Sequence, residues 1–432
     1  MQALLAFEQG PPVAAPLRFF VTAPLYLVLA GLLLAFEGET IFVSRWTPAA
    51  LAVTHLLTLG FMLQIMLGAL IQILPVVAGA NLPRPRLIAA LVHPLLNCGV
   101  LCLVLGFLQS ASGWMYAAAA FLIGALGLFV GAAGWALWRV RSTSPSIRGL
   151  KMALVALAIT AASGLYMLFA LAGGWPVALE RLTNLHAGWG LGGWSAILLA
   201  AVAYVVVPMF QLTPGYPARP AWWFPRLIFL TLLLWSVGTL TDAAWLVGDA
   251  RFLLSLIGLF FVIQTLQLQR RRRRARPDAT LRYWQFGLYA LLLVLLMVLV
   301  GSLLPRLAES DAWPLLLGLL VLMGGYVAFI TGMLYKIVPF LLWFDLQNRS
   351  AIGKPPPAMN RLLGEPEALR QLRVFHLACA LLLGAWLWPA GLSIPAGFLV
   401  VLAGAGLFLN LARAVWRYRK FRQPALVNGK EA

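Results

Sequence analysis

The sequence contains little charge and little cysteine. Only 10% of its 432 residues are charged, 62% are hydrophobic, and the mean hydropathy is +0.90. A soluble globular domain carries nearer a quarter charged residues, so this composition excludes one. The three cysteines, Cys98, Cys102 and Cys379, all lie inside apolar runs, which excludes a disulfide framework. The chain is therefore expected to lie in a membrane, with no large soluble domain beside its spans.

Acidic residues are also scarce, since 13 Asp and Glu accompany 32 Lys and Arg, for a net charge of +19. When the basic residues are assigned to alternate loops, 27 fall on one side and 4 on the other, with Lys336 inside a span. This bias predicts a bacterial inner (plasma) membrane protein with both termini in the cytoplasm. The charge is then a topology signal, so no nucleic-acid partner is expected. We interpret the arginines at 270–274 as a topology anchor rather than a lipid-headgroup or partner site.

Twelve apolar runs are long enough to cross a bilayer. They lie at 17–36, 48–78, 87–109, 114–139, 149–172, 183–210, 221–248, 252–268, 280–302, 313–343, 370–389 and 392–416. Backbone groups in lipid must be satisfied within each segment, which favours helices for runs of this length. The predicted fold class is therefore an all-α integral membrane protein with twelve transmembrane helices in a single membrane domain, 1–432. An acidic, proline-containing leader precedes the first run, which is expected to be retained rather than cleaved.

Three spans share a pattern in which a small residue is followed seven positions later by a proline. The three segments are Gly68 to Pro75, Ala201 to Pro208, and Gly332 to Pro339. Their prolines recur at nearly equal intervals along the chain, four spans apart, and they fall on spans 2, 6 and 10. This spacing predicts a pseudo-threefold arrangement of four-helix repeats, approximately 1–148, 149–279 and 280–432. Each proline is expected to end its helix.

Two of the four histidines occupy equivalent positions in these repeats. His55 precedes Pro75 by nearly the same interval as His186 precedes Pro208, whereas span 10 has no histidine there. A histidine inside a span is costly to desolvate and usually faces the bundle interior or a cavity. Glycines follow both histidines and would let a flat ring approach the backbone. The pair could therefore ligate a haem, handle protons or ions, or pack between helices.

The remaining histidines, His93 and His376, lie on spans 3 and 11, which also carry all three cysteines. Together with Cys98 and Cys379 they offer the soft donor set that Cu(I) prefers. The alternative is ordinary packing, because cysteine is often buried as a small apolar residue and the helical rise separates His93 from Cys98 by about 7.5 Å. Lys336 is expected to snorkel to the interface, with a proton pathway as the alternative.

These features resemble subunit I of the haem-copper oxidases and nitric oxide reductases, and the related NnrS-like membrane proteins described as binding haem and copper. The segments that carry the resemblance are His55 to Pro75, Leu185 to Trp194, and Gly332 to Pro339. The resemblance covers most of the chain at the level of topology. It implies that His55 corresponds to a low-spin haem ligand, and that His186 lies on the span that supplies a copper ligand.

The family's other metal ligands are missing. Span 10 reads Trp313 to Leu322 where the family has His-x-His, and span 7 contains no histidine. Without them a copper beside a high-spin haem cannot be built in the family's manner, so a competent terminal oxidase is not expected. No nucleophile with an adjacent base stands out, so no catalytic residue is predicted.

Two functions of different classes remain. The first is an oxidase-like membrane protein that binds haem b through His55 and His186 for electron transfer, gas sensing or a stress response. Other respiratory or cytochrome subunits would be its partners, besides the lipid bilayer. The second is a cofactor-free membrane carrier or respiratory-complex assembly factor on the same scaffold, because fold analogy cannot decide function.

Overall fold

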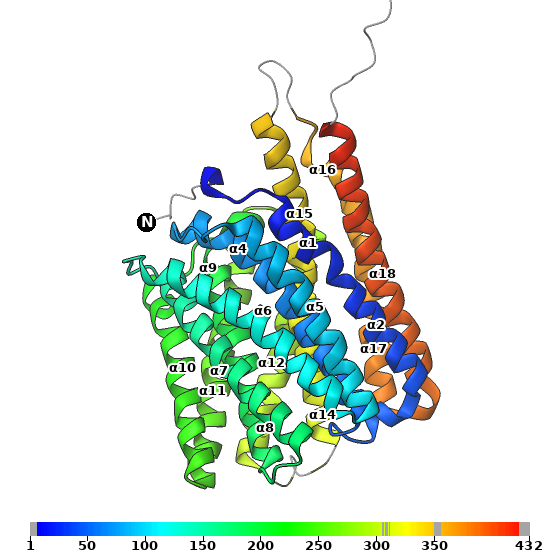
Figure 1. The fold of residues 1–432 in the computed structure, drawn as a ribbon. Helices are drawn as coiled ribbons and strands as arrows, with labels where there is room; N and C mark the ends of the chain where they lie inside the picture. The colour runs from blue at the N-terminus through cyan, green and yellow to red at the C-terminus, as the bar shows by residue number, and fades with distance from the viewer. Residues whose placement is uncertain (1–6, 305, 307–309, 311, 350–355, 423–432) are drawn as a thin grey trace, which may run out of the picture.

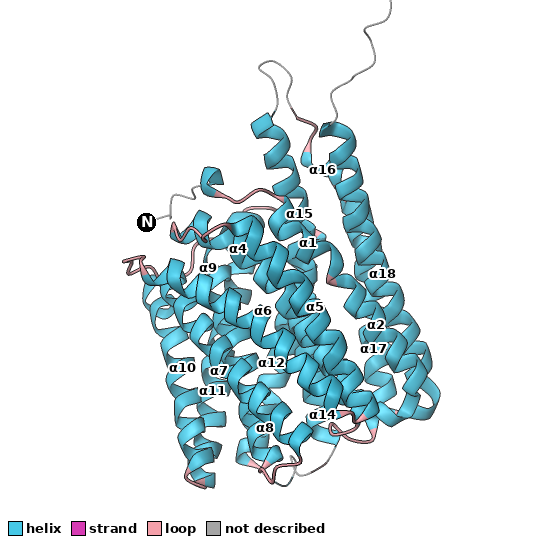
Figure 2. Ribbon diagram, viewed as in Figure 1, coloured by secondary structure: helices cyan, strands magenta, loops and turns pink. Residues whose placement is uncertain are grey.

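The computed structural model describes residues 7–304, 306, 310, 312–349 and 356–422, and every regular element in them is helical (Figure 1; Figure 2). Twelve segments are long and apolar enough to span a membrane. They are Ala14–Phe42 (α1, α2, η2), Pro48–Ala78 (α3, η3, α4), Pro85–Gln109 (α5), Ser112–Trp138 (α6), Pro145–Gly173 (α7), Leu179–Gln211 (α8, η4, α9), Ala218–Leu240 (α10), Ala244–Arg270 (α11), Ala279–Leu303 (α12), Ala312–Arg349 (α14, η5, α15), Glu365–Leu387 (α17) and Pro389–Arg422 (α18). The predicted all-α membrane fold is confirmed.

The long helices lie side by side in one bundle, with the loops gathered at its two ends (Figure 2). Both described ends of the chain, η1 (Phe7–Gln9) and the last turns of α18, lie at the same end, the upper one in Figure 1. We call this the basic end, because most Lys and Arg residues lie there. The opposite end has Arg45, Arg181, Arg251 and Arg306.

Spans 2, 6 and 10 each contain a π-helix, which the sequence did not predict. These are η3 (Leu56–Leu63), η4 (Gly188–Ala196) and η5 (Leu320–Val327), and their first residues are equally spaced along the chain. Each is preceded by a short α-helix and followed by a longer one: α3 (Pro48–His55) and α4 (Gln64–Ala78), α8 (Leu179–Ala187) and α9 (Ile197–Gln211), α14 (Ala312–Leu319) and α15 (Ala328–Arg349). Such regularly spaced π-helices are what a threefold repeat would produce, and π-helices often mark functional positions.

The prediction that the three repeat prolines end their helices is wrong. Pro75 and Pro208 are each followed by a further helical turn, and α15 continues well beyond Pro339, to Arg349. Proline removes one backbone donor and frees the carbonyl four residues earlier, but neighbouring helices can accommodate this inside a membrane bundle.

The helix bundle closes through contact between its first and last spans. Gly31 of α2 (Pro24–Glu37) lies against Gly397 of α18 so closely that an added Cβ on Gly397 would be 2.7 Å from the Gly31 carbonyl oxygen. Small residues allow two helix backbones to approach in this way.

The boundary between spans 7 and 8 differs from the prediction: α10 ends at Leu240, and Asp242 adopts a left-handed conformation with φ of 61°.

Candidate functional site

The structure brings the two repeat-equivalent histidines near each other, at the same position along their respective spans. His55 is the eighth residue of the span Pro48–Ala78, and His186 is the eighth residue of the span Leu179–Gln211. The helical rise places each about 10 Å from the start of its span. The two imidazoles are both half-buried, and they lie close enough for the protonation of one to affect the other. They lie beside the π-helices η3 and η4, towards the end of the bundle opposite the basic end.

The ring of His55 is oriented by its own helix. Its Nδ1 lies 2.8 Å from the carbonyl oxygen of Leu51, and the ring packs against Phe107 with centroids 5.2 Å apart. Because a carbonyl can only accept, Nδ1 carries the proton and donates it. The lone pair of the neutral ring then resides on Nε2, which has no hydrogen-bond partner among the described residues.

His186 has the same tautomer as His55, with the proton on Nδ1, but a neighbouring helix fixes it. Its Nδ1 lies 3.1 Å from both the Thr160 carbonyl oxygen and the Ser163 hydroxyl, and that hydroxyl donates to the same carbonyl. The Nδ1–H therefore donates to this pair, and Nε2 again holds the lone pair. Gly164 makes room for the ring, since a Cβ there would lie 2.8 Å from the His186 Cε1.

Basic side chains lie close to this pair at the end of α8. Arg45, from the loop before α3, donates to the Asn184 side chain at 2.7 Å and pairs with Glu180 at 3.7 Å. Arg251 of α11 lies over the ring of Trp235 at 5.1 Å and interacts electrostatically with Arg45 and Glu180. Arg45 thus contacts α8 two residues before His186, and Arg251 lies near Arg45 and Glu180.

The glycines that were expected to admit a flat ring are already covered by protein side chains. A Cβ on Gly60 would lie 2.3 Å from the Tyr26 ring, and one on Gly188 would lie 2.9 Å from the Trp235 ring. The rings that approach these backbones are therefore tyrosine and tryptophan. Imidazole Nε2 atoms are donors that haem iron accepts, so the donor set of His55 and His186 suits a haem, whereas Gly60 and Gly188 do not provide a slot for its ring.

His93 belongs to a different, hydrogen-bonded polar cluster nearer the basic end. Its Nε2 lies 2.8 Å from the Thr22 hydroxyl, which also accepts from the Gln64 amide at 2.6 Å and donates to the Arg18 carbonyl. The Asn97 amide donates to the His93 carbonyl at 2.5 Å. This nitrogen is engaged in hydrogen bonding, so His93 is held as a core histidine between α1 (Ala14–Thr22) and α5.

The four residues offered as copper ligands are not assembled. Cys98 is exposed on α5, whereas Cys379 is buried on α17 one turn from His376. The Nε2 of His376 is buried without a partner, and its ring packs 4.5 Å from that of Phe286. No three His, Cys, Asp or Glu side chains in the described part of the chain could hold one metal ion together.

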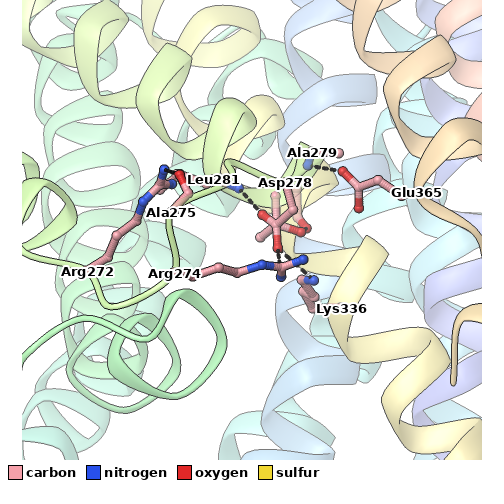
Figure 3. A network of polar contacts seen from close by, with 10 residues as sticks. Arg272, Arg274, Ala275, Asp278, Ala279, Leu281, Lys336 and Glu365 are labelled. Atoms are coloured by element: carbon pink, nitrogen blue, oxygen red, sulfur yellow. Dashed lines mark hydrogen bonds and ion pairs between the residues drawn. The ribbon is translucent and has the colours of Figure 1, made fainter.

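The ammonium of Lys336 extends to the start of α12, at the basic end of the bundle, where it meets an acidic partner. Its ammonium pairs at 2.9 Å with Asp278, whose side chain is only 7% exposed (Figure 3). Asp278 also pairs with Arg274 at 3.1 Å and caps α12 by accepting from the Leu281 amide. The charge of Lys336 is therefore neutralised inside the protein, where span 10 meets the start of span 9.

Residues that orient the histidines were missed by sequence reasoning. Thr160, Ser163 and Gly164 lie on span 5, the span before the one that carries His186. Their only signal is a run of small and hydroxyl residues in an apolar span, which is common at helix contacts.

No protein-family model matches this chain, and no curated protein matches it.

Proposed function

We propose that this chain is a haem-binding membrane protein in which His55 and His186 ligate the iron of one b-type haem. One observation carries the proposal: two imidazoles from equivalent repeat positions lie near each other, and each donates its Nδ1–H to a carbonyl, which leaves the lone pair on Nε2. Histidines that ligate metals usually donate their other ring N–H to a carbonyl or similar acceptor, as both do here. His55 and His186 would hold haem b, which would supply reversible one-electron chemistry.

The protein's own residues would fix the ligands and balance the cofactor's charge. The Leu51 carbonyl and the Thr160–Ser163 pair hold each ring in the required tautomer. Arg45 and Arg251 lie near the histidines, and guanidinium groups bind carboxylates such as the two propionates of haem. His93 and His376 lie away from this pair, so the site suits electron transfer, gas sensing or a stress response rather than oxygen reduction. Respiratory or cytochrome subunits would be the partners of such a protein.

The same proposal places the protein in a bacterial inner membrane with its basic end in the cytoplasm. The support is the bias of 27 basic residues to 4, which acts as a topological determinant. A reporter fused after residue 276 is expected to be active only as a cytoplasmic marker. Periplasmic activity of that fusion would invert the topology and move the histidines to the cytoplasmic half.

A second function is favoured by the covered glycines. Because Tyr26 and Trp235 fill the faces of Gly60 and Gly188, the bundle is well packed there without a cofactor, as a carrier or assembly factor would be. A visible absorption spectrum separates the two functions. Protein purified from haem-replete cells should show a Soret band that shifts with dithionite; a spectrum without that band would exclude the haem proposal and leave the cofactor-free one.

A further inference from the structure

Two arginines converge on one tryptophan at the basic end, between α7 and α10. Arg148 in the first turn of α7 and Arg226 in α10 lie over the ring of Trp222, at 5.7 and 3.3 Å from its centroid. Arg226 also donates to the Trp222 carbonyl. Both arginines are half-buried, and their charges are close enough to repel each other. The repulsion between the two guanidinium groups destabilises this arrangement, and a nearby anion would relieve it.

No carboxylate in the described part of the chain lies within ion-pair distance of these two arginines. The sequence has no Asp or Glu between Glu39 and Glu180, and none in the loops that join α6 to α7 and α9 to α10. Glu180 itself lies at the opposite end of the bundle, in the first turn of α8. Among the described residues, neither arginine forms an ion pair within the protein.

In the third repeat region, by contrast, basic residues pair with acidic residues of the same chain. There Lys336 pairs with Asp278 at 2.9 Å, and Arg417 pairs with Glu367 at 2.7 Å. Both acids are mostly buried, so these charges are matched from within. The contrast indicates that the counter-ion of Arg148 and Arg226 comes from outside the chain.

The surroundings of the pair select the kind of anion. Trp223, which is 51% exposed, packs edge-on against Trp222 with ring centroids 4.6 Å apart. From it a continuous stripe of exposed apolar side chains runs along α10. The stripe consists of Trp223, Leu227, Leu230, Leu234 and Val237. Interfacial tryptophan beside a lipid-facing helix places the two arginines at headgroup depth.

We propose that Arg148, Arg226 and Trp222 bind the phosphate of an anionic phospholipid, whose acyl chain lies along the exposed stripe of α10. Guanidinium groups bind phosphate through paired, charge-assisted hydrogen bonds. The N-terminus of α7 adds positive potential beside Arg148, because no side chain caps it. A freely dissolved phosphate would satisfy the same charges but would gain nothing from the apolar stripe, so the structure favours the lipid.

The test measures lipid binding to the full chain in zwitterionic detergent micelles. Phosphatidylglycerol, phosphatidylcholine and inorganic phosphate are added separately, and each Kd is measured by thermal shift and by native mass spectrometry. The double variant Arg148→Gln and Arg226→Gln should bind phosphatidylglycerol about tenfold more weakly, which is the effect of removing one or two charge-assisted contacts. The matched control, Arg141→Gln and Arg219→Gln, removes two exposed charges from the same end and should bind as the unaltered chain does.

Each outcome decides the proposal. Selective binding of phosphatidylglycerol that only the first double variant weakens supports it. Equal binding by both double variants overturns it, since net charge alone would then account for the effect. Equal saturation of the site by inorganic phosphate overturns the assignment to lipid. If the glutamine variant does not fold, the double variant Arg148→Lys and Arg226→Lys is used instead. It keeps both positive charges but loses the planar guanidinium groups that bind phosphate through two hydrogen bonds. It should bind the lipid more weakly and should have the same unfolding temperature as the unaltered chain when no lipid is present.

Discussion

The hydroxyl of Tyr326 in η5 donates a hydrogen bond of 2.6 Å to the backbone carbonyl of Leu191 in η4. It joins two of the three π-helices across 135 residues of sequence. The irregular hydrogen bonding of a π-helix leaves backbone groups that other parts of the structure must satisfy, and a tyrosine from the equivalent helix does this here.

Tyr326→Phe should therefore lower the free energy of unfolding by about 1 kcal/mol, because the Leu191 carbonyl loses its partner while the packing volume stays nearly the same. The measurement is thermal unfolding of the purified protein in detergent. Tyr289→Phe is the matched control, since Tyr289 is 54% exposed on α12 and should be neutral. Equal shifts for the two variants would contradict a specific role for this bond.

The ion pair of Asp278 and Lys336 predicts an asymmetry between its two partners. In Lys336→Met, Asp278 keeps its ion pair with Arg274 and its hydrogen bond from the Leu281 amide. In Asp278→Ala, α12 loses its N-cap, and both Arg274 and Lys336 lose their acidic partner. We expect Asp278→Ala to destabilise by about 3 kcal/mol and Lys336→Met by clearly less.

Arg349 provides the control for this pair. It bonds to Asp345 in the same helix at 2.7 Å but is 54% exposed, so Arg349→Gln should cost well under about 1 kcal/mol. Unfolding temperatures of the three variants check the order. If Lys336→Met were the most destabilising, the lysine rather than the aspartate would be the centre of the network.

Closure of the bundle can be tested at Gly397. A Cβ at this position would lie 2.5 Å from the Ala35 backbone nitrogen, and backbone atoms cannot move aside as a flexible side chain can. Gly397→Ala should therefore separate α2 from α18 and destabilise by about 1–3 kcal/mol. Gly406→Ala in the same helix meets only a Gln371 side-chain carbon at 3.5 Å and should be neutral or stabilising, because glycine is a poor helix former. An equal decrease in unfolding temperature for both variants would show that the close backbone contact at Gly397 is not the cause.

Features of the fold and the site that depend on neighbouring residues in the sequence could be predicted, whereas features that depend on contacts between distant segments could not. The twelve spans were predictable, because about 20 consecutive apolar residues are sufficient evidence for one. The equivalence of His55 and His186 followed from repeat spacing. The partner of Lys336 did not, because Asp278 lies at the start of another span, distant in sequence, and only the fold brings them together. The π-helices were also unpredictable, since they depend on contacts between helices rather than on a composition of their own.

The haem proposal makes a prediction for each of the four histidines. His55→Ala and His186→Ala should each abolish the low-spin spectrum or convert it to high-spin, because one remaining imidazole leaves the iron five-coordinate. His93→Ala and His376→Ala should leave the spectrum unchanged, since His93 is bonded to Thr22 and His376 packs against Phe286. The measurement is the reduced-minus-oxidised difference spectrum of each purified variant.

Gly164 distinguishes loss of ligation from loss of folding. Gly164→Ala would place a Cβ 2.8 Å from the His186 ring, so it should displace that imidazole and change the spin state while both histidines remain. Gly127→Ala is the control, because a Cβ on Gly127 has no neighbour within 4 Å. Each variant must first show an unfolding temperature close to that of the unaltered chain, since emptying or overfilling a packed core also costs stability. A normal low-spin haem in folded His186→Ala would show that the pairing is wrong and that His55 has another partner or none.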